Sequence, residues 1–368
     1  MRLAWLQLTH FRSYLDLRFD PDEGINLLIG PNGSGKTAVL EAVAYLGYLR
    51  SFRGVPDEAL VSLNAETSVL RGEVDAAGGT HVIGVSLPRV GRRAVEVDGK
   101  RPRRNRELRR FLRAVTFLPD DLNIVKTGSA IRRNLLDDIA GDLHPTALAD
   151  QSEYEKAVRQ RNALLKQDFR PEEQELTTWD EQVARTGARV HIRRMEVIDL
   201  LAPLLTGIYR DLSGSNDNLA WSYESKWATD VAGDEQSLSA GLADALLESR
   251  VVDLARRSTT RGPHRDDPSL RIGDRDGRVH ASQGEQRTIV LALRLATFDL
   301  LRDTFSEAPI LLLDDVFSEL DVARSKALLE RLPGAQVFIT AARREDVPVG
   351  GRMWDVSLEE GASRVTAN

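Results

Sequence analysis

Apolar and polar residues alternate through the first part of the chain, which is typical of β-strands with one buried face. The alternation covers 3–8 and 14–19, and a continuous apolar run at 25–29 indicates a fully buried strand. Apolar residues then recur at helical spacing over 38–49. Between 59 and 118 the pattern returns to short strands separated by turns. The first third of the chain is therefore expected to form strands around one helix.

A helical pattern dominates from about residue 129 to 212, with Pro171 as the expected break between two helices. Further on, the pattern predicts a helix over 236–255, a helix ending at 305, a strand over 309–313, a helix over 322–332 and a strand over 337–340. This order predicts an α/β protein with an inserted helical lobe, divided as 1–125, 126–257 and 258–368. The helical part is too short and irregular for a long coiled coil.

The composition is that of an ordinary globular protein, with 368 residues, 42% hydrophobic and 29% charged. The absence of cysteine excludes disulfides, thiolate metal sites and cysteine nucleophiles. No apolar run approaches the roughly 18 residues that span a bilayer. Residues 1–14 have neither a continuous apolar core nor a small-residue cleavage site. We expect a cytoplasmic protein without a membrane partner.

The net charge of −6 argues against a uniformly basic nucleic-acid binder. One strip is nevertheless strongly basic, because eight cations face only Glu107 over 100–113. The cations are Lys100, Arg101, Arg103, Arg104, Arg106, Arg109, Arg110 and Arg113. Such a strip can bind DNA phosphates without sequence preference. A solvated hairpin and helix face paired with acidic neighbours explains it equally well.

The strongest chemical signal is a glycine-rich loop that fits G-x-x-x-x-G-K-[ST]. It consists of Gly30, Pro31, Asn32, Gly33, Ser34, Gly35, Lys36 and Thr37. A strand precedes it and a helix follows, which is the context this phosphate loop requires and which disfavours a chance turn. Lys36 is expected to reach the β- and γ-phosphates of a nucleotide, and Thr37 to bind Mg²⁺.

Two further segments carry candidate chemistry. The strand over 310–313 delivers Asp314 and Asp315 at its carboxyl end, where parallel α/β sheets bind ligands. Asp314 is placed to hold Mg²⁺ and Asp315 to polarise the attacking water. The segment 281–287 contains an S-x-x-E capping box, and its serine with free helix N–H groups also makes an anion site.

The order of motifs along the chain resembles that of the ABC-type ATPase heads of the structural-maintenance-of-chromosomes and recombination-repair families. The motifs are the phosphate loop, the serine-glycine signature at 281–287, the acid-terminated strand and the segment 318–321. Within that group the sequence is similar to the RecF family of bacterial recombination mediators. Further similar segments are 11–14, 117–122, Arg132 and Arg133 before Leu136 and Asp137, and 262–267. The similarity covers residues 1 to about 343.

The resemblance implies mixed sheets around the phosphate loop and ATP held between two protomers. Ser282 and Gly284 would contact the γ-phosphate of the partner protomer, and Ser318 to Asp321 would cross the interface. Thr340 would sense the γ-phosphate and Arg12 would touch the nucleotide.

The sequence departs from the family pattern in several places. Ala281 and Gln283 replace the common Leu and Gly of the signature, and no clear Gln loop lies near Pro119. Asp315 stands where many ABC proteins have Glu, and because a shorter carboxylate positions water less well, we expect slow hydrolysis.

The resemblance further implies an ATP-driven homodimer that closes on duplex, single-stranded or gapped DNA. RecO and RecR would be its partners in loading recombinase, with ATP and Mg²⁺ as cofactors and weak, DNA-dependent ATPase activity. Alternatives are an arm-less chromosome-organising ATPase, an ABC ATPase of another assembly such as a transporter, and a P-loop kinase. The polar residues His264 and Arg265 lie in the segment from Gly262 to Asp267. They could form a metal site or a catalytic pair, or they could belong to a hydrogen-bonded turn, and we assign them no chemistry.

Overall fold

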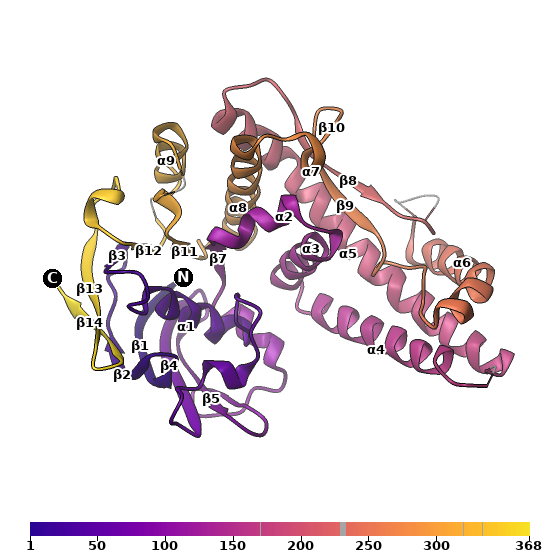
Figure 1. The fold of residues 1–368 in the computed structure, drawn as a ribbon, viewed down its shortest axis with the longest axis horizontal. Coiled ribbons are helices and arrows are strands. Elements are labelled where there is room, and N and C mark those ends of the chain that lie inside the picture. The colour runs from indigo at the N-terminus through magenta and orange to yellow at the C-terminus, as the bar shows by residue number, and fades with distance from the viewer. Residues whose placement is uncertain (170, 229–232, 319, 333) are drawn as a thin grey trace. The chain divides into compact units, whose positions relative to one another are not determined.

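Figure 1 shows the computed structural model of the chain, which describes residues 1–368 except 170, 229–232, 319 and 333. The chain forms two compact units. Unit 1 consists of Met1–Asp121 and Leu293–Asn368, and unit 2 consists of Leu122–Ala292. The helical lobe is therefore an insertion into an α/β body, as the hydrophobic pattern predicts.

The first sheet of unit 1 is antiparallel and has the strand order β2-β1-β4-β5-β6. Its strands are β1 (Arg2–Phe11), β2 (Tyr14–Phe19), β4 (Thr67–Ala76), β5 (Gly79–Pro88) and β6 (Ala94–Val97). In β1 the buried side chains are Leu3, Leu6, Leu8 and Phe11. The alternating pattern at the start of the chain thus has the expected consequence of one buried sheet face.

The second sheet of unit 1 has the order β14-β13-β3-β12-β11-β7. Its strands are β3 (Ile25–Ile29), β7 (Ala114–Phe117), β11 (Ile310–Asp314), β12 (Val337–Ala341), β13 (Arg352–Glu359) and β14 (Ala362–Ala367). All neighbours are parallel except β13 and β14, which form a hairpin. The hydrophobic pattern predicts β3, β11 and β12, whereas it does not predict the hairpin.

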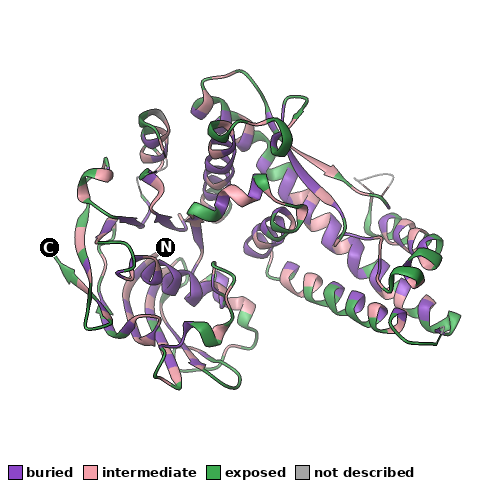
Figure 2. Cartoon of the chain, in the orientation of Figure 1, coloured by how far each residue is buried: buried purple, intermediate pink, exposed green. Residues whose placement is uncertain are grey.

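Helix α1 (Lys36–Tyr48) lies in the core of unit 1 and is buried along nearly its whole length (Figure 2). Val39, Val43 and Leu46 pack in one cluster with Leu3 of the first sheet and Phe338 of the second. The other helices that lie in unit 1 are α9 (Val322–Leu329), η1 (Asp57–Leu60), η2 (Asn105–Arg110), η4 (Val316–Ser318) and η5 (Arg344–Asp346). Because both sheets pack on α1, the loop before this helix is held on a rigid base.

Unit 2 is mostly helical. Its helices are α2 (Asn123–Lys126), α3 (Ser129–Leu143), α4 (Ala147–Leu165), α5 (Glu173–Ser213), α6 (Glu235–Arg256) and α7 (Gly277–His280), and its strands β8 (Leu219–Glu224), β9 (Asp267–Ile272) and β10 (Arg275–Asp276). Two helices cross the boundary between the units, η3 (Pro119–Leu122) and α8 (Gln283–Phe305).

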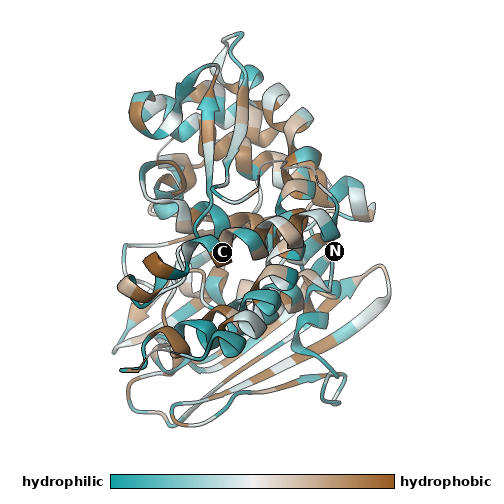
Figure 3. Ribbon diagram, turned by 90° about the vertical axis from the view of Figure 1, so that its right-hand side faces the viewer, coloured by the Kyte–Doolittle hydropathy of each residue, from teal (hydrophilic) through white to brown (hydrophobic). Residues whose placement is uncertain are grey.

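The break at Pro171 separates α4 from α5, as expected. Helix α5 has 41 residues and packs along α3, α4 and α6. It is therefore part of a bundle rather than a coiled-coil arm. Figure 3 shows hydrophilic and hydrophobic residues mixed along the helices. Within the described residues, no helix has the length and hydropathy needed to cross a membrane.

One boundary differs from the sequence-based expectation, which assigned 258–292 to the ATPase head. The structure assigns these residues to unit 2. The reason is pairing, because β9 joins β8 over six residue pairs and Arg132 donates to the carbonyl of Pro268 at 2.6 Å. Ser282 and Gly284 consequently belong to the helical unit.

Candidate nucleotide site

The phosphate loop bridges the end of β3 and the first residue of α1. Gly33 and Gly35 have φ angles of 82° and 108°, in the region that favours glycine. A Cβ on Gly35 would also lie 2.5 Å from Ser363 Oγ on the C-terminal hairpin. The first N–H groups of α1 have no partner within the helix. The loop therefore has the backbone geometry of an anion site at a helix N-terminus.

Lys36 lies along the inside of this loop and is 8% exposed. Its Nζ donates to the carbonyl oxygens of Gly30 at 2.6 Å and Pro31 at 2.9 Å. Burial lowers the pKa of Lys36, and the neighbouring Asp315 and Asp314 oppose that shift. Ser34 Oγ is buried without a hydrogen-bond partner among the described residues. Ser34 is not among the residues that line the cavity described below.

Asp314 ends β11 directly beside the phosphate loop. Thr37 Oγ1 donates to its carboxylate, at 2.8 Å from Oδ1 and 3.0 Å from Oδ2. Thr340, the register partner of Asp314 on β12, donates to Oδ1 at 2.8 Å. One carboxylate and one hydroxyl are oxygen ligands suited to Mg²⁺, which takes its remaining ligands from waters and phosphates. No group of three or more potential metal-binding side chains occurs in the described part of the chain.

Asp315 adopts a left-handed backbone conformation with φ 52°. Its N–H donates to Thr340 Oγ1 at 2.9 Å, and its carbonyl accepts from Ser318 Oγ at 2.7 Å. Burial, together with the charge of Asp314, raises the pKa of the Asp315 carboxyl. Strain of this kind is typical of functional sites and persists only where the surroundings hold it.

A cavity of about 870 Å³ in unit 1 brings many of the predicted residues together. It is lined by the predicted residues Arg12, Asn32, Gly33, Gly35, Lys36, Thr37, Asp314, Asp315 and Thr340. The other described lining residues are His10, Ser13, Leu15, Ala38, Arg53, Ala59, Val61, Ser62, Leu63, Asn64, Ala65, Pro119 and Gly361. Apart from Ser13 and Pro119, which lie in the family-like segments 11–14 and 117–122, this second group belongs to no recognised motif. The volume is in the range of small-molecule sites.

The signature residues are in unit 2, at the start of α8. Ser282 N–H donates to Glu285 Oε2 at 2.8 Å, and Glu285 N–H donates to Ser282 Oγ at 3.3 Å. The first of these bonds lowers the pKa of Glu285. Ser282 and Gly284 are exposed, and neither lines the described cavity. The capping box is therefore present, and its serine lies at the surface.

The predicted interface loop is partly described. Ser318 is exposed, and Asp321 caps α9 by accepting the N–H of Arg324 at 2.9 Å. Glu319 lies outside the described residues.

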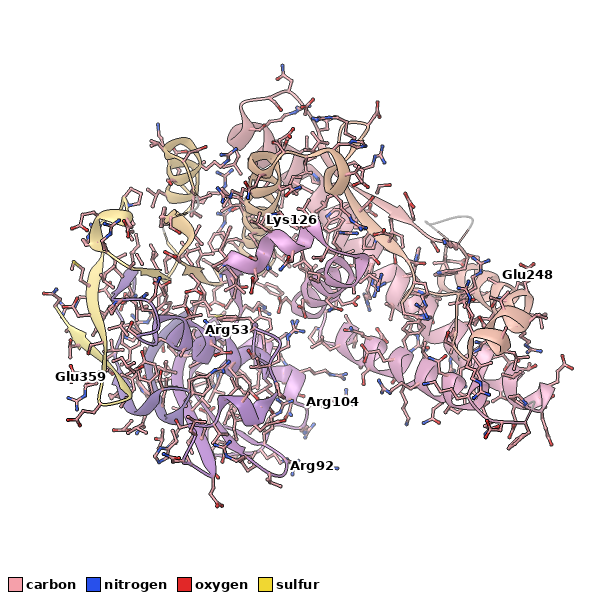
Figure 4. The ribbon with its side chains drawn as sticks, viewed as in Figure 1. Arg53, Arg92, Arg104, Lys126, Glu248 and Glu359 are labelled. Carbon is pink, nitrogen blue, oxygen red and sulfur yellow. The ribbon has the colours of Figure 1, made fainter. Side chains whose placement is uncertain are left out.

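Most cations of the basic strip lie on the surface of unit 1. The exposed ones are Lys100, Arg101, Arg103, Arg104 and Arg110, while Arg106 and Arg113 are half-buried. Figure 4 shows Arg104 projecting from its loop. Arg109 differs from the expectation, since it is 6% exposed and its guanidinium lies 4.7 Å from the centre of the Tyr48 ring. Packing on this aromatic side chain removes Arg109 from the surface.

The segment 262–267 is a hydrogen-bonded turn, in which Arg265 N–H donates to the carbonyl of Gly262 at 2.8 Å. His264 Nδ1 lies 2.5 Å from Tyr154 Oη, and burial lowers the pKa of His264 to about 4. Asp266 accepts from Trp227 Nε1 at 3.1 Å. These bonds account for His264 and Asp266 as hydrogen-bonded residues of unit 2, whereas the side chain of Arg265 is exposed.

This sheet order, with the phosphate loop on β3 and the carboxylates on β11, defines an ABC-type ATPase head. The family described as RecF/RecN/SMC N terminal domain matches residues 2–364. The DNA replication and repair protein RecF of Acidothermus cellulolyticus is 40% identical over 360 residues, which is 96% of this chain and 97% of that protein. The chain belongs to the RecF family.

Solved structures agree with this assignment. The recombination mediator protein RecF with ATP, from the RecFOR pathway, is 31% identical with a TM-score of 0.92, over 99% of this chain and 97% of that chain. The head of Smc bound to the C-winged helix domain of ScpA is 18% identical with a TM-score of 0.59, over 100% and 98%. The latter likeness concerns the fold alone.

Proposed function

We propose that the chain binds ATP with Mg²⁺ in the cavity of unit 1 and hydrolyses it. The observation that carries this proposal is the placement of Thr37, Asp314 and Thr340 in one hydrogen-bonded group beside the phosphate loop. The loop N–H groups and Lys36 hold the phosphates, and Thr37 and Asp314 hold the metal ion. When bound, Mg²⁺ neutralises phosphate charge.

Asp315 is the residue proposed to orient and polarise the attacking water. Its backbone N–H is held by Thr340 and its carbonyl by Ser318, which fixes the position of the backbone from which the side chain projects. Because aspartate is one methylene shorter than the glutamate of many ABC proteins, hydrolysis is slow. This rate suits a timer of ATP-bound complexes.

ATP binding is further proposed to join two copies of the chain. Ser282 and Gly284 are exposed at the start of a helix, where a serine hydroxyl and helix N–H groups suit an anion. The family resemblance assigns them to the γ-phosphate of the partner protomer, with Ser318 and Asp321 at the same interface. A ligand that binds only the dimer stabilises it by mass action. Light scattering tests this step, since a protein that stays monomeric at micromolar concentration with ATP would contradict it.

The partner of the ATP-bound dimer is proposed to be DNA in recombinational repair, with RecO and RecR as protein partners, and the protein is expected in the cytoplasm. A relative is described as a DNA replication and repair protein, and a solved relative as a recombination mediator. The exposed cations of the strip supply the contacts to the DNA backbone. The dimer would close on DNA with ATP and open on hydrolysis.

DNA binding with and without ATP, on duplex, single-stranded and gapped substrates, tests the clamp. For the wild type we expect ATP to raise DNA affinity, and for Lys36→Arg we expect this effect to be lost. Equal DNA affinity with and without ATP would remove the basis of the mechanism.

The strip is tested by replacing Arg103, Arg104 and Arg110 with Ala. DNA affinity should fall, and the salt dependence should become shallower by about 0.9 for each phosphate that the strip no longer neutralises. The matched control replaces three other cations of unit 1, which are Arg18, Arg302 and Arg364, and it removes the same charge. If both triple variants lose equal affinity, the strip is no specific DNA surface.

A further inference from the structure

Arg12 lies at the edge of the cavity and is held through its backbone and through all three nitrogen atoms of its guanidinium group. Its N–H donates to Leu60 O at 2.7 Å, and its carbonyl accepts from Ser62 Oγ at 2.7 Å. Nε and Nη2 each donate to one carboxylate oxygen of Glu41 at 2.8 Å, and Nη1 donates to Ala59 O at 3.1 Å. The backbone of Arg12 is left-handed, with φ 54°. Such a strained residue persists because its surroundings fix it.

Glu41, on α1 five residues after Lys36, is completely buried. Its carboxylate accepts from Arg12 through both oxygens and from Ser51 Oγ through Oε1. Ser51 Oγ in turn accepts the N–H of Arg53 at 3.0 Å, and Arg53 also lines the cavity. One buried carboxylate therefore ties two cavity-lining segments to the helix that follows the phosphate loop.

A buried carboxylate is costly unless its partners compensate for lost hydration, and an apolar residue commonly gives equal stability. Glu41 nevertheless occupies this core position, and the side chain of its partner Arg12, which lines the cavity, is 21% exposed. The guanidinium has five N–H donors, of which three are used by Glu41 and Ala59, so two remain for a ligand. A fixed guanidinium loses less entropy when it binds an anion.

We propose that Glu41 is a positioning residue, which holds Arg12 in place for the phosphates or ribose of the nucleotide and acts only through Arg12. The inference rests on the proposed nucleotide site. Glu41 touches no ligand itself, because it is sealed behind Arg12 and Ser51.

The substitution Glu41→Gln separates charge from shape. Each carboxylate oxygen accepts an N–H of Arg12, which can only donate, so an amide in the same place must turn its NH₂ group toward one of these N–H groups. The amide NH₂ of the glutamine then faces an N–H of Arg12, so two donors meet without an acceptor. The remaining hydrogen bond to Arg12 is also weaker, because its acceptor no longer carries a charge. Arg12 is then no longer fixed in its present orientation.

The experiment measures nucleotide affinity, by fluorescence of an ATP analogue, for the wild type, Glu41→Gln, Arg12→Ala and the double variant. Loss of a fixed charge-assisted hydrogen bond predicts about tenfold weaker binding for each single variant. The double variant should bind no more weakly than Arg12→Ala alone. The matched control is Glu23→Gln, an exposed carboxylate of unit 1 outside the cavity lining, which should leave affinity unchanged.

Thermal unfolding of the ligand-free variants separates positioning from stability. Unchanged affinity of Glu41→Gln, with a lowered Tm, overturns the inference and leaves Glu41 a purely structural residue. Affinity losses that multiply in the double variant also overturn it, because Glu41 then acts independently of Arg12. If the wild type and Lys36→Ala bind the analogue equally poorly, the proposed nucleotide site itself fails, which is a different outcome.

Discussion

The hydroxyl of Thr340 holds Asp314, at the end of β11, and Asp315, directly after it, in place. Thr340→Val removes this hydroxyl at nearly constant volume. Thr340 is 1% exposed, so water cannot replace its bonds. The valine loses a bond to the Asp314 carboxylate and leaves the N–H of Asp315 unpaired. A hydrogen bond to a charged group contributes about 1.5 to 3 kcal/mol and a neutral one about 1 kcal/mol. We therefore expect the free energy of unfolding to fall by about 2.5 to 4 kcal/mol.

The assay is the unfolding of ligand-free protein in urea, and the quantity compared is the midpoint of the transition in which unit 1 unfolds. Thr297→Val is the matched control, because Thr297 belongs to the same unit and is 4% exposed. Among the described residues, its hydroxyl bonds the carbonyl of Leu293, four residues earlier in α8, and this acceptor keeps its helical N–H partner. The control should cost no more than about 1 kcal/mol, the contribution of one neutral hydrogen bond, and therefore less than Thr340→Val. Equal midpoints for the two variants would refute the assigned role of Thr340.

Two further predictions concern unit 2. Arg161 is completely buried between Asp180 and Asp253, at 2.6 and 2.7 Å, so Arg161→Met leaves two buried carboxylates and should cost about 3 to 5 kcal/mol in urea unfolding. Arg159→Met, which removes an exposed arginine of the same helix, should cost less than about 0.5 kcal/mol, and similar losses would contradict the argument. For His264 the pKa is about 4 in the folded state against 6.5 for the free side chain. The unfolded chain binds the extra proton between these values, so stability should fall by up to about 1.4 kcal/mol per pH unit as pH drops from 6.5 to 4. In His264→Gln this slope should be lost, whereas an unchanged pH dependence would show that His264 is not its source.

The local motifs of the site were predictable because their chemistry dictates the residue types. A loop that curls around phosphate needs glycine at Gly33 and Gly35, and an apolar strand ending in acids marks Asp314. The order of strand, loop and helix around Lys36 also follows from hydrophobic periodicity.

The parts that escaped prediction depend on contacts between residues distant in sequence. The hairpin β13–β14 has mostly polar or half-exposed positions, so its pattern is weak. Charge alone places Arg109 on the surface, whereas the ring of Tyr48, 61 positions earlier, accounts for its burial. Glu41 has the sequence context of an ordinary helix residue, and only the fold places Arg12 against it. The assignment of 267–272 to unit 2 likewise follows from the pairing of β9 with β8, two strands that are distant in sequence.

The position of β3 in its sheet determines when the site forms during synthesis. Both strands that flank β3, which are β12 and β13, come from the last 32 residues of the chain. The strand that carries Asp314 also emerges from the ribosome after all of unit 2. A nascent chain that has not yet reached β12 therefore has the phosphate loop and the first sheet, but it lacks both neighbours of β3 in the second sheet. Because the proposed nucleotide site draws on segments from both sides of unit 2, we expect it to form only after unit 2 has been synthesised.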